Sequence, residues 1–325
     1  MATRRQFMCT MSALAILMAA NDLAAEAEKP GDSVAHTPPD FKVPTGACDC
    51  HVHVIGPQDR FPMAPERLYT PDYAPVEELA RHLKVLHLDR VVIVTPSPYG
   101  TDNRSTLYAI QKLGKRARGV AVVPANIKHS ELEELHRQGI RGVRLNVETG
   151  GTNDAKLLIN MLKKAADTVA PLEWHVQIYT NLSMIAALRD VIPALPVPVV
   201  FDHFGRLEAK KGLQQPGLPV LLDMLKSGKV YVKLSAPYRI SELEGYSDAK
   251  TYVEAMVSAN PDRVLWGSDW PHTIPAPGKK RTREGIERFR HEDDGLALNR
   301  MARWVPNHEH LKKLLAENAG RLYFF

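Results

Sequence analysis

Short runs rich in β-branched residues alternate with longer amphipathic stretches along most of this 325-residue chain. Strands separated by helices pair in parallel through right-handed crossovers. Eight such units in roughly 280 residues are the usual content of a (β/α)₈ barrel. The sequence therefore predicts the α/β class, with a (β/α)₈ TIM barrel as a single domain.

The predicted strands are 47–54, 90–94, 119–123, 142–146, 173–179, 197–203, 230–234 and 264–268. The predicted helices are 76–88, 106–113, 130–138, 154–168, 182–191, 216–226, 248–258 and 309–316. A doubly wound sheet is the alternative fold, but it usually has a glycine-rich turn after the first strand. Here Cys50-His51-Val52-His53 stands at that point instead.

The N-terminus has the pattern of an export signal. Arg4-Arg5 precedes an apolar stretch at 8–20, which is too short to span a membrane, and Ala25 and Ala27 offer a cleavage site. We expect 1–27 to be a twin-arginine signal peptide, 28–44 a proline-rich linker and 45–325 the barrel domain. The mature protein is then expected in the periplasm, with no membrane association after signal removal.

The chain carries a formal charge of +5 and has a pI near 9.0. Its basic residues are scattered among acidic ones, with no lysine- or arginine-rich run, zinc finger or aromatic RNA-binding signature. We therefore expect no nucleic-acid partner, and a small anionic substrate fits the positive charge equally well. Cys48 and Cys50 lie two apart in a predicted strand, where their side chains are parallel, so both are predicted to be packing residues without a disulfide.

Candidate catalytic residues gather at the ends of three predicted strands. His51 and His53 alternate on one strand and should share a face, Asp202-His203 end another, and Asp269 follows Gly267-Ser268. Active sites of (β/α)₈ barrels form at the C-terminal ends of the strands. We therefore expect these side chains to meet at the barrel mouth, with Asp269 placed as a general base.

These motifs resemble those of the amidohydrolase-related family of the amidohydrolase superfamily. His51-Val52-His53, Asp202-His203 and Gly267-Ser268-Asp269-Trp270-Pro271 resemble its motifs at three strand ends. The chain is most similar to the lactone branch, which includes 2-pyrone-4,6-dicarboxylate lactonase and D-galactarolactone isomerase. Further similar segments are Phe61-Pro62, Ala64-Pro65-Glu66-Arg67, Tyr69-Thr70-Pro71, Gly100-Thr101-Asp102-Asn103 and Arg141-Gly142-Val143-Arg144.

The resemblance leaves the metal requirement open. Metal-dependent relatives bind zinc through similar residues, and His51, His53, His203 and Asp269 could hold one zinc ion tetrahedrally. This chain departs from the family's metal pattern, because Arg144-Leu145-Asn146 offers no bridging lysine or glutamate. The end of strand 173–179 presents Tyr179, with His175 about two layers deeper. The similar lactonases use their histidines without metal, so we favour no cofactor, with zinc as the alternative.

Arginines near the predicted mouth indicate a substrate with several carboxylates, because a guanidinium group binds carboxylates through paired hydrogen bonds. Arg144, Arg206 and Arg239 are the main candidates, with Arg141 as a weaker one and Tyr69, Tyr179 and Ser97 as orienting donors. Replacing Arg206 or Arg239 is expected to leave the melting temperature nearly unchanged, because surface arginines contribute little to stability, and a solvated rim is the alternative to substrate binding.

The favoured function is a hydrolase that opens a carboxylated lactone, as the resemblance implies. Asp269 would activate water, and His51, His53 and His203 would polarise the carbonyl. A sugar-acid lactone isomerase and a zinc-dependent hydrolase or decarboxylase are the alternatives. A binding protein without catalysis is disfavoured, because it would not need these histidines and this aspartate.

Overall fold

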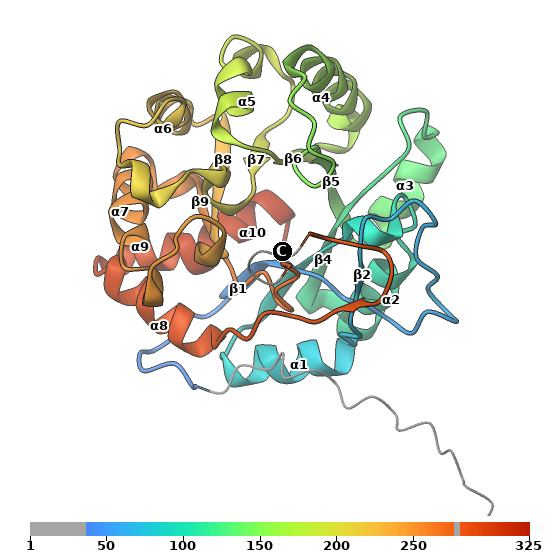
Figure 1. Cartoon of the computed structure of the whole chain (residues 1–325), viewed down its shortest axis with the longest axis horizontal. Coiled ribbons are helices and arrows are strands. Elements are labelled where there is room, and N and C mark those ends of the chain that lie inside the picture. The colour runs from blue at the N-terminus through green and yellow to red at the C-terminus, as the bar shows by residue number, and fades with distance from the viewer. Residues whose placement is uncertain (1–36, 276–279) are drawn as a thin grey trace, which may run out of the picture. The chain divides into compact units, whose positions relative to one another are not determined.

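The computed structural model describes residues 37–275 and 280–325. Eight parallel strands form one sheet in the order β1-β3-β4-β5-β6-β7-β8-β9, surrounded by helices (Figure 1). A bridge between Val52 and Trp270 joins the two ends of the sheet, so it closes into a barrel. The strands are β1 Cys48–Val52, β3 Arg90–Val94, β4 Ala117–Ala121, β5 Ile140–Asn146, β6 His175–Tyr179, β7 Val199–Phe201, β8 Val230–Ser235 and β9 Val264–Gly267. The predicted (β/α)₈ barrel is confirmed.

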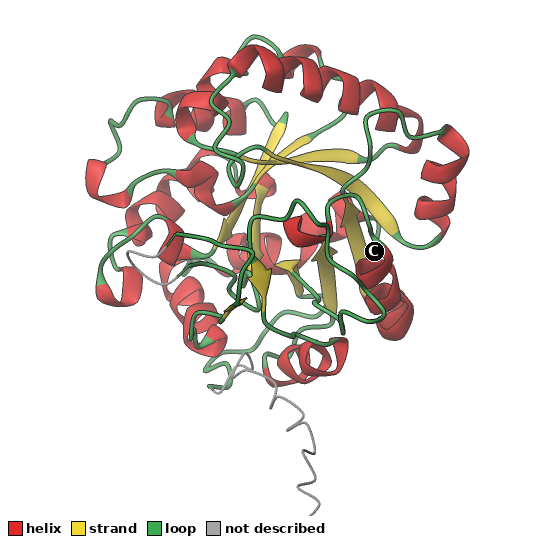
Figure 2. Ribbon diagram, turned by 45° about the vertical axis from the view of Figure 1, so that its right-hand side comes forward, coloured by secondary structure: helices red, strands yellow, loops and turns green. Residues whose placement is uncertain are grey.

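At least one helix follows each strand of the barrel. Figure 2 shows the helices around the outside of the sheet. The helices are α1 Val76–Val85, α2 Arg104–Leu113, α3 His129–Arg137, α4 Ala155–Val169, α5 Leu182–Ala187, α6 Leu218–Lys226, α7 Ala249–Ala259, α8 Asp294–Trp304, α9 His308–Lys312 and α10 Asn318–Tyr323. In α4 the buried residues Leu158, Leu162, Ala166 and Val169 recur three and four apart, as a helix needs to cover a barrel.

The predicted elements differ from the observed ones mainly at their ends. Strand 197–203 is shorter, because the chain leaves the sheet after Phe201 and turns at 203–206 with positive φ angles. Helix α8 was missed, although Asp293 caps it by accepting a hydrogen bond from the amide of Leu296. Strand β5 begins at Ile140, two residues earlier than predicted.

The N-terminal end of the barrel is filled by apolar side chains. Cys48 and Cys50 are free and buried there, in a cluster with Val92, Leu265 and Tyr323. This confirms that the two cysteines form no disulfide and act in packing. With one end of the barrel closed in this way, the polar residues of the interior lie nearer the other end.

The signal peptide predicted at 1–27 and the start of the predicted linker lie outside the described residues. The linker's last residues, 37–44, contact α8: Thr37 donates a hydrogen bond to Asp293 at 2.5 Å, and the amide of Asp40 donates to Asn299 at 2.8 Å. None of the helices in the described part of the chain is long and apolar enough to cross a membrane.

A second, two-stranded sheet joins two loops that follow barrel strands. Strand β2 (Thr70–Pro71) lies in the loop after β1, and β10 (Ile286–Glu287) in the loop after β9. The pairing brings Tyr69, which precedes β2, under the guanidinium of Arg281, 3.7 Å from the ring centre. Because both loops leave the C-terminal ends of their strands, this sheet lies beside the barrel mouth.

Candidate active site

Three histidines surround one oxygen of a buried aspartate. Asp269 Oδ1 lies 3.6 Å from His51 Nε2, 3.7 Å from His53 Nε2 and 3.6 Å from His203 Nε2. These four residues come from the ends of β1, β7 and β9, and each is at most 4% exposed. The structure therefore brings together all four predicted catalytic residues.

The other carboxylate oxygen of Asp269 is fully engaged. Oδ2 accepts hydrogen bonds from the Tyr238 hydroxyl at 2.6 Å and from Arg239 Nε and Nη2 at 2.9 and 2.6 Å. Within the described residues, Oδ1 accepts no hydrogen bond. The fork of Arg239 thus fixes the carboxylate and leaves one oxygen directed at the histidines.

Asp269 is held ionised. Burial alone would raise the pKa of this carboxyl, but the positive charge of Arg239 and the nearby His203 and His51 outweigh burial and hold the pKa well below its ordinary value. Its backbone φ of +70° is unusual for a residue with a side chain. An ionised carboxylate with a free oxygen can accept a proton at neutral pH.

The three histidines have different hydrogen bonds at Nδ1. His53 Nδ1 lies 2.7 Å from the carbonyl of Val94, so it must donate, and Nε2 of the neutral ring carries a lone pair. Burial, assisted by His51, lowers the pKa of His53 to about 3 and keeps it neutral. His203 Nδ1 lies 2.8 Å from the Ser235 hydroxyl, which can donate or accept. The expectation that all three histidines polarise a carbonyl therefore fails for His53, whose Nε2 is an acceptor.

His51, His53 and Asp269 offer donor atoms that all lie within 4.8 Å of one another, which suits a divalent metal, whereas His203 does not join this group. Ligand atoms on a tetrahedral zinc are separated by about 3.3–3.6 Å, given bonds of 2.0–2.2 Å. His51 Nε2 and Asp269 Oδ1 are both buried and make no hydrogen bond to the residues described. These residues could hold a metal ion, provided that each histidine offers a lone pair at Nε2.

A buried charged layer lies against His51 on the side away from Asp269. Asp202 Oδ2 accepts hydrogen bonds from Arg144 Nε and Gln177 Nε2, both at 3.1 Å. Lys233 Nζ on β8 donates to Gln177 Oε1 at 2.7 Å and lies 3.2 Å from His51 Nδ1. Burial lowers the pKa of Lys233 to about 8, although Asp202 opposes this shift.

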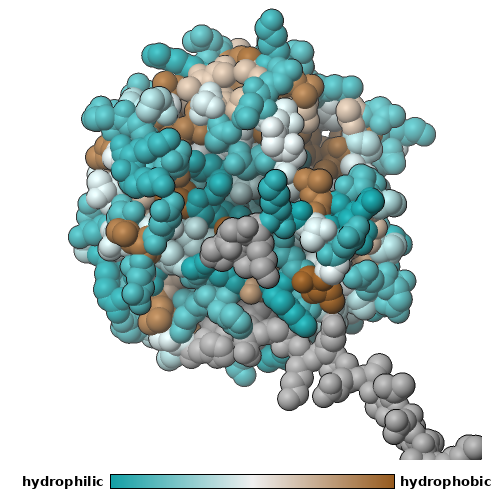
Figure 3. Space-filling model, in the orientation of Figure 1, coloured by the Kyte–Doolittle hydropathy of each residue, from teal (hydrophilic) through white to brown (hydrophobic). Residues whose placement is uncertain are grey.

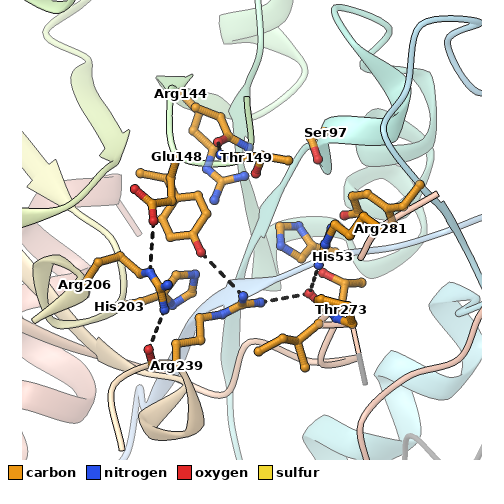
Figure 4. A pocket seen from close by; sticks show the side chains of 15 residues that line it. His53, Ser97, Arg144, Glu148, Thr149, His203, Arg206, Arg239, Thr273 and Arg281 are labelled. Atoms are coloured by element: carbon orange, nitrogen blue, oxygen red, sulfur yellow. Dashed lines mark hydrogen bonds and ion pairs between the residues drawn. The ribbon is translucent and has the colours of Figure 1, made fainter. Parts of the chain in front are cut away.

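A pocket of about 310 Å³ lies above the histidines (Figure 4). The predicted substrate-binding residues that line it are Tyr69, Ser97, Arg144, Tyr179, Arg206 and Arg239, together with His53 and His203. Figure 3 shows that hydrophilic residues predominate on this face of the molecule. A pocket with four arginines and a single glutamate in its lining suits an anionic ligand.

Two of the predicted arginines already bind buried carboxylates. Arg239 forms an ion pair with Asp269, and its side chain is 8% exposed. Arg144 forms an ion pair with Asp202 at 3.0 Å, and its side chain is 5% exposed. Arg239 is therefore not the surface residue that was expected, and both arginines compensate buried charges. Arg206, at 27% exposure, is closer to that expectation, with Nε 3.5 Å from Glu148.

Arg141 does not reach the pocket. It follows the first residue of β5, at the opposite end of the strand from Asn146, and its guanidinium donates to the carbonyls of His136 and Ile140. Arg141 is therefore not part of the predicted substrate site, because it lies near the N-terminal end of β5 whereas the pocket is at the C-terminal ends of the strands. His175 lies deep in the barrel as expected, with its ring 5.2 Å from that of Tyr323.

Several residues at the site were not predicted. Arg281 and Thr273 line the pocket from the loop after β9, where no strand pattern marks their position. Tyr238 follows β8 and could have been suspected only from its place beside Arg239. Lys233 had a readable signal, because a lysine interrupts the apolar strand Val230–Ser235.

Comparison with known proteins agrees with this geometry. The family model described as amidohydrolase matches residues 48–325. The chain belongs to the amidohydrolase family. It is 37% identical to a 2-pyrone-4,6-dicarboxylate hydrolase of Comamonas testosteroni, covering 88% of this chain and 92% of the relative. It is 33% identical to a 4-sulfomuconolactone hydrolase of Rhizobium radiobacter, covering 90% and 95%.

A solved structure of this amidohydrolase family has the same fold. It is a probable 2-pyrone-4,6-dicarboxylic acid hydrolase from Acinetobacter baumannii with citric acid bound, 28% identical to this chain. The match covers 86% of this chain and all of the other, with a TM-score of 0.73. Membership of this family makes the chain an enzyme, as predicted.

Proposed function

We propose that this amidohydrolase hydrolyses a lactone that carries additional carboxylates. The observation that carries the proposal is Asp269, a buried ionised carboxylate with one free oxygen beside three histidines. The pocket beside it is lined by four arginines together with His53 and His203, whereas Asp269 and His51 are not in the lining. A base of this kind can activate water, and the arginines supply the charge that carboxylates require.

The proposed reaction begins with water beside Asp269 Oδ1. As the water oxygen bonds to the lactone carbonyl carbon, Asp269 accepts one of its protons and the carbonyl oxygen becomes an oxyanion. The oxyanion then collapses, the ring carbon–oxygen bond breaks, and Asp269 returns the proton to the departing oxygen. The product is a ring-opened acid, which releases a proton at neutral pH.

The histidines divide the work in this mechanism. His53 Nε2, an acceptor, helps Asp269 to orient the attacking water, since the Val94 carbonyl holds its proton on the other nitrogen. His51 and His203 then donate hydrogen bonds to the carbonyl oxygen of the lactone, provided that their Nε2 atoms carry protons. A metal held by His51, His53 and Asp269 would instead supply Lewis-acid polarisation of the carbonyl. We favour the route through hydrogen-bond donors.

The relatives support the substrate class. Two of them are described as hydrolases of 2-pyrone-4,6-dicarboxylate and of 4-sulfomuconolactone, both anionic lactones, and a solved relative contains citric acid. A D-galactarolactone isomerase of Agrobacterium fabrum is 24% identical, so isomerisation is the second candidate.

A panel of lactones with and without carboxylates tests the proposal. We expect proton release, followed with a pH indicator, from carboxylated lactones and little from neutral ones. Equal rates on both kinds would contradict the substrate class. A new lactone formed without a titratable acid would indicate isomerisation instead. Elemental analysis of the same preparation measures whether activity follows metal content.

Arg206→Met tests the carboxylate contact directly. Arg206 is the most exposed of the three predicted arginines, and losing a charge-assisted hydrogen bond should weaken binding by about 2–3 kcal/mol. We therefore expect KM for a carboxylated lactone to rise about thirty- to a hundredfold, with kcat and melting temperature nearly unchanged. A neutral lactone is the control, and an equal rise in its KM would show that Arg206 does not act on a carboxylate.

We also propose export to the periplasm by the twin-arginine route. Arg4-Arg5 before the apolar stretch supports it. N-terminal sequencing of protein from its native host should find cleavage near Ala25 or Ala27. Replacing both arginines by lysine should block processing. Unprocessed, active protein in the cytoplasm of wild-type cells would refute this proposal.

A further inference from the structure

Lys233 is a fully buried lysine that the proposed reaction does not use. Its side chain points into the barrel from β8 and is among the largest fully buried side chains in the described part of the chain. Besides Gln177 Oε1, the nearest polar atoms to Nζ are His51 Nδ1 at 3.2 Å and Asp202 Oδ1 at 3.7 Å. Burying a lysine is costly, so a lysine at this position calls for a reason.

The contact with His51 has only one direction when the lysine is charged. An ammonium group has three donors and no acceptor, so His51 Nδ1 must accept. A neutral His51 then carries its proton on Nε2, the atom 3.6 Å from Asp269 Oδ1. The lysine contact therefore selects one of the two tautomers of the ring.

Asp202 favours the opposite tautomer. Its Oδ1 lies 3.2 Å from His51 Nδ1, the same distance as Lys233 Nζ, and could accept a proton from it, but Oδ1 meets no hydrogen-bond geometry among the described residues. Gln177 links the two competitors: it accepts from Lys233 through Oε1 and donates to Asp202 Oδ2 through Nε2. Gln177 and Arg144 thus engage Asp202 at Oδ2, and Lys233 is left as the hydrogen-bond partner of His51 Nδ1.

The two tautomers would give the site different chemistry. With the proton on Nε2, His51 is a hydrogen-bond donor toward the reacting atoms, and it cannot bind a metal through that atom. With the proton on Nδ1, Nε2 offers a lone pair and completes the set of metal ligands. His53 has this second arrangement already, because a carbonyl faces its Nδ1.

We propose that Lys233 is a positioning residue that holds His51 in the Nε2-protonated tautomer, making His51 a hydrogen-bond donor in the site and opposing metal binding there. The donor role rests on the proposed lactone hydrolysis. The tautomer and the metal preference do not, so they can be tested whether or not the chain opens lactones.

The tautomer of His51 in the wild-type protein is the first test. In protein labelled with ¹⁵N-histidine, the ring signals of His51 are identified by their loss in His51→Gln, and the pattern of one-bond and two-bond couplings reports which nitrogen carries the proton. We expect protonated Nε2 and unprotonated Nδ1. A proton on Nδ1 of a neutral ring would overturn the proposal without any change at Lys233.

Lys233→Met is the second test, with Lys226→Met on the exposed face of α6 as a matched control. Without the lysine, Asp202 should take the proton of His51 Nδ1 and Nε2 should gain a lone pair. After incubation with zinc and gel filtration, we expect about one zinc per chain in Lys233→Met, and far less than one in wild type and in Lys226→Met. Tight, stoichiometric zinc in the wild type that requires His51 would overturn the proposal.

The proposed role of His51 as a hydrogen-bond donor in catalysis is tested separately. If the wild type hydrolyses lactones, Lys233→Met without metal should lose about a hundredfold in kcat, the usual effect of losing one oxyanion donor, with little change in KM. An unchanged kcat would refute the donor role of His51. A wild type inactive on every lactone would refute the proposed function alone, since the ¹⁵N and zinc measurements still decide the role of Lys233.

Discussion

Replacing Asp269 by asparagine is expected to lower kcat for lactone opening by roughly 10²–10⁴-fold, the usual contribution of a positioned general base. Asparagine has nearly the same shape, and its carbonyl oxygen can still accept from Tyr238 and Arg239, but it cannot take a proton from water. The measurement is the initial rate of acid release, with circular dichroism and a thermal melt to confirm that the variant is folded.

Asp223→Asn on α6 is the matched control for this change, since the Asp223 side chain is 64% exposed and lies 3.7 Å from that of Lys226. It should retain the wild-type rate. If Asp269→Asn kept more than about a tenth of the rate, Asp269 would not be the base. The nearby imidazoles would then have to accept the proton of water in its place.

The sequence predicted the centre of this site because strand ends can be located from pattern alone. His51, His53, His203 and Asp269 follow apolar runs, and parallel strands bring their C-terminal ends to one mouth. Tyr179 was predicted by the same argument and lines the pocket. The positions were therefore accessible even though the hydrogen bonds of each ring were not.

The ion-pair partners of the site residues and the exact ends of the strands could not be predicted from the sequence. Arg239 and Asp269 are 30 residues apart, and nothing local indicates that one neutralises the other. Arg141 was included only for its closeness in sequence to Arg144, although both the predicted and the observed strand place it at the N-terminal end, away from the mouth. The tautomers of the histidines depend on the Val94 carbonyl and on Lys233, which only the folded barrel brings into contact with them.

Arg239→Met is expected to lower the free energy of unfolding by about 3–5 kcal/mol at neutral pH, the usual effect of removing one partner of a buried ion pair. Arg239 and Asp269 are 8% and 0% exposed, and the change would leave the carboxylate buried without its main counter-charge. Urea unfolding of both proteins measures the difference. Arg206→Met is the control, because its partly exposed side chain should matter far less.

The double variant Arg239→Met/Asp269→Asn separates the charge from the packing. If the loss comes from an unpaired carboxylate, the double variant should be more stable than Arg239→Met alone, because asparagine removes the buried charge. A double variant as unstable as the sum of the single changes would contradict this and would assign the loss to the packing of the arginine.

The stability of wild type and Arg239→Met should also depend on pH in different directions. In the wild type the depressed pKa of Asp269 contributes stability that is present above the pKa of an unfolded aspartate and is lost as pH falls through the folded value. Without Arg239, burial dominates and the pKa of Asp269 should rise above its ordinary value. Protonation of Asp269 would then remove the unpaired buried charge, so the difference in the free energy of unfolding between wild type and variant should shrink as pH is lowered from 7 toward 4.

Because the pKa of Asp269 is raised in the variant, the acid limb of its kcat/KM profile should also move to higher pH. A difference in the free energy of unfolding that stays constant over this pH range would mean that the charge of Arg239 does not control the ionisation of Asp269.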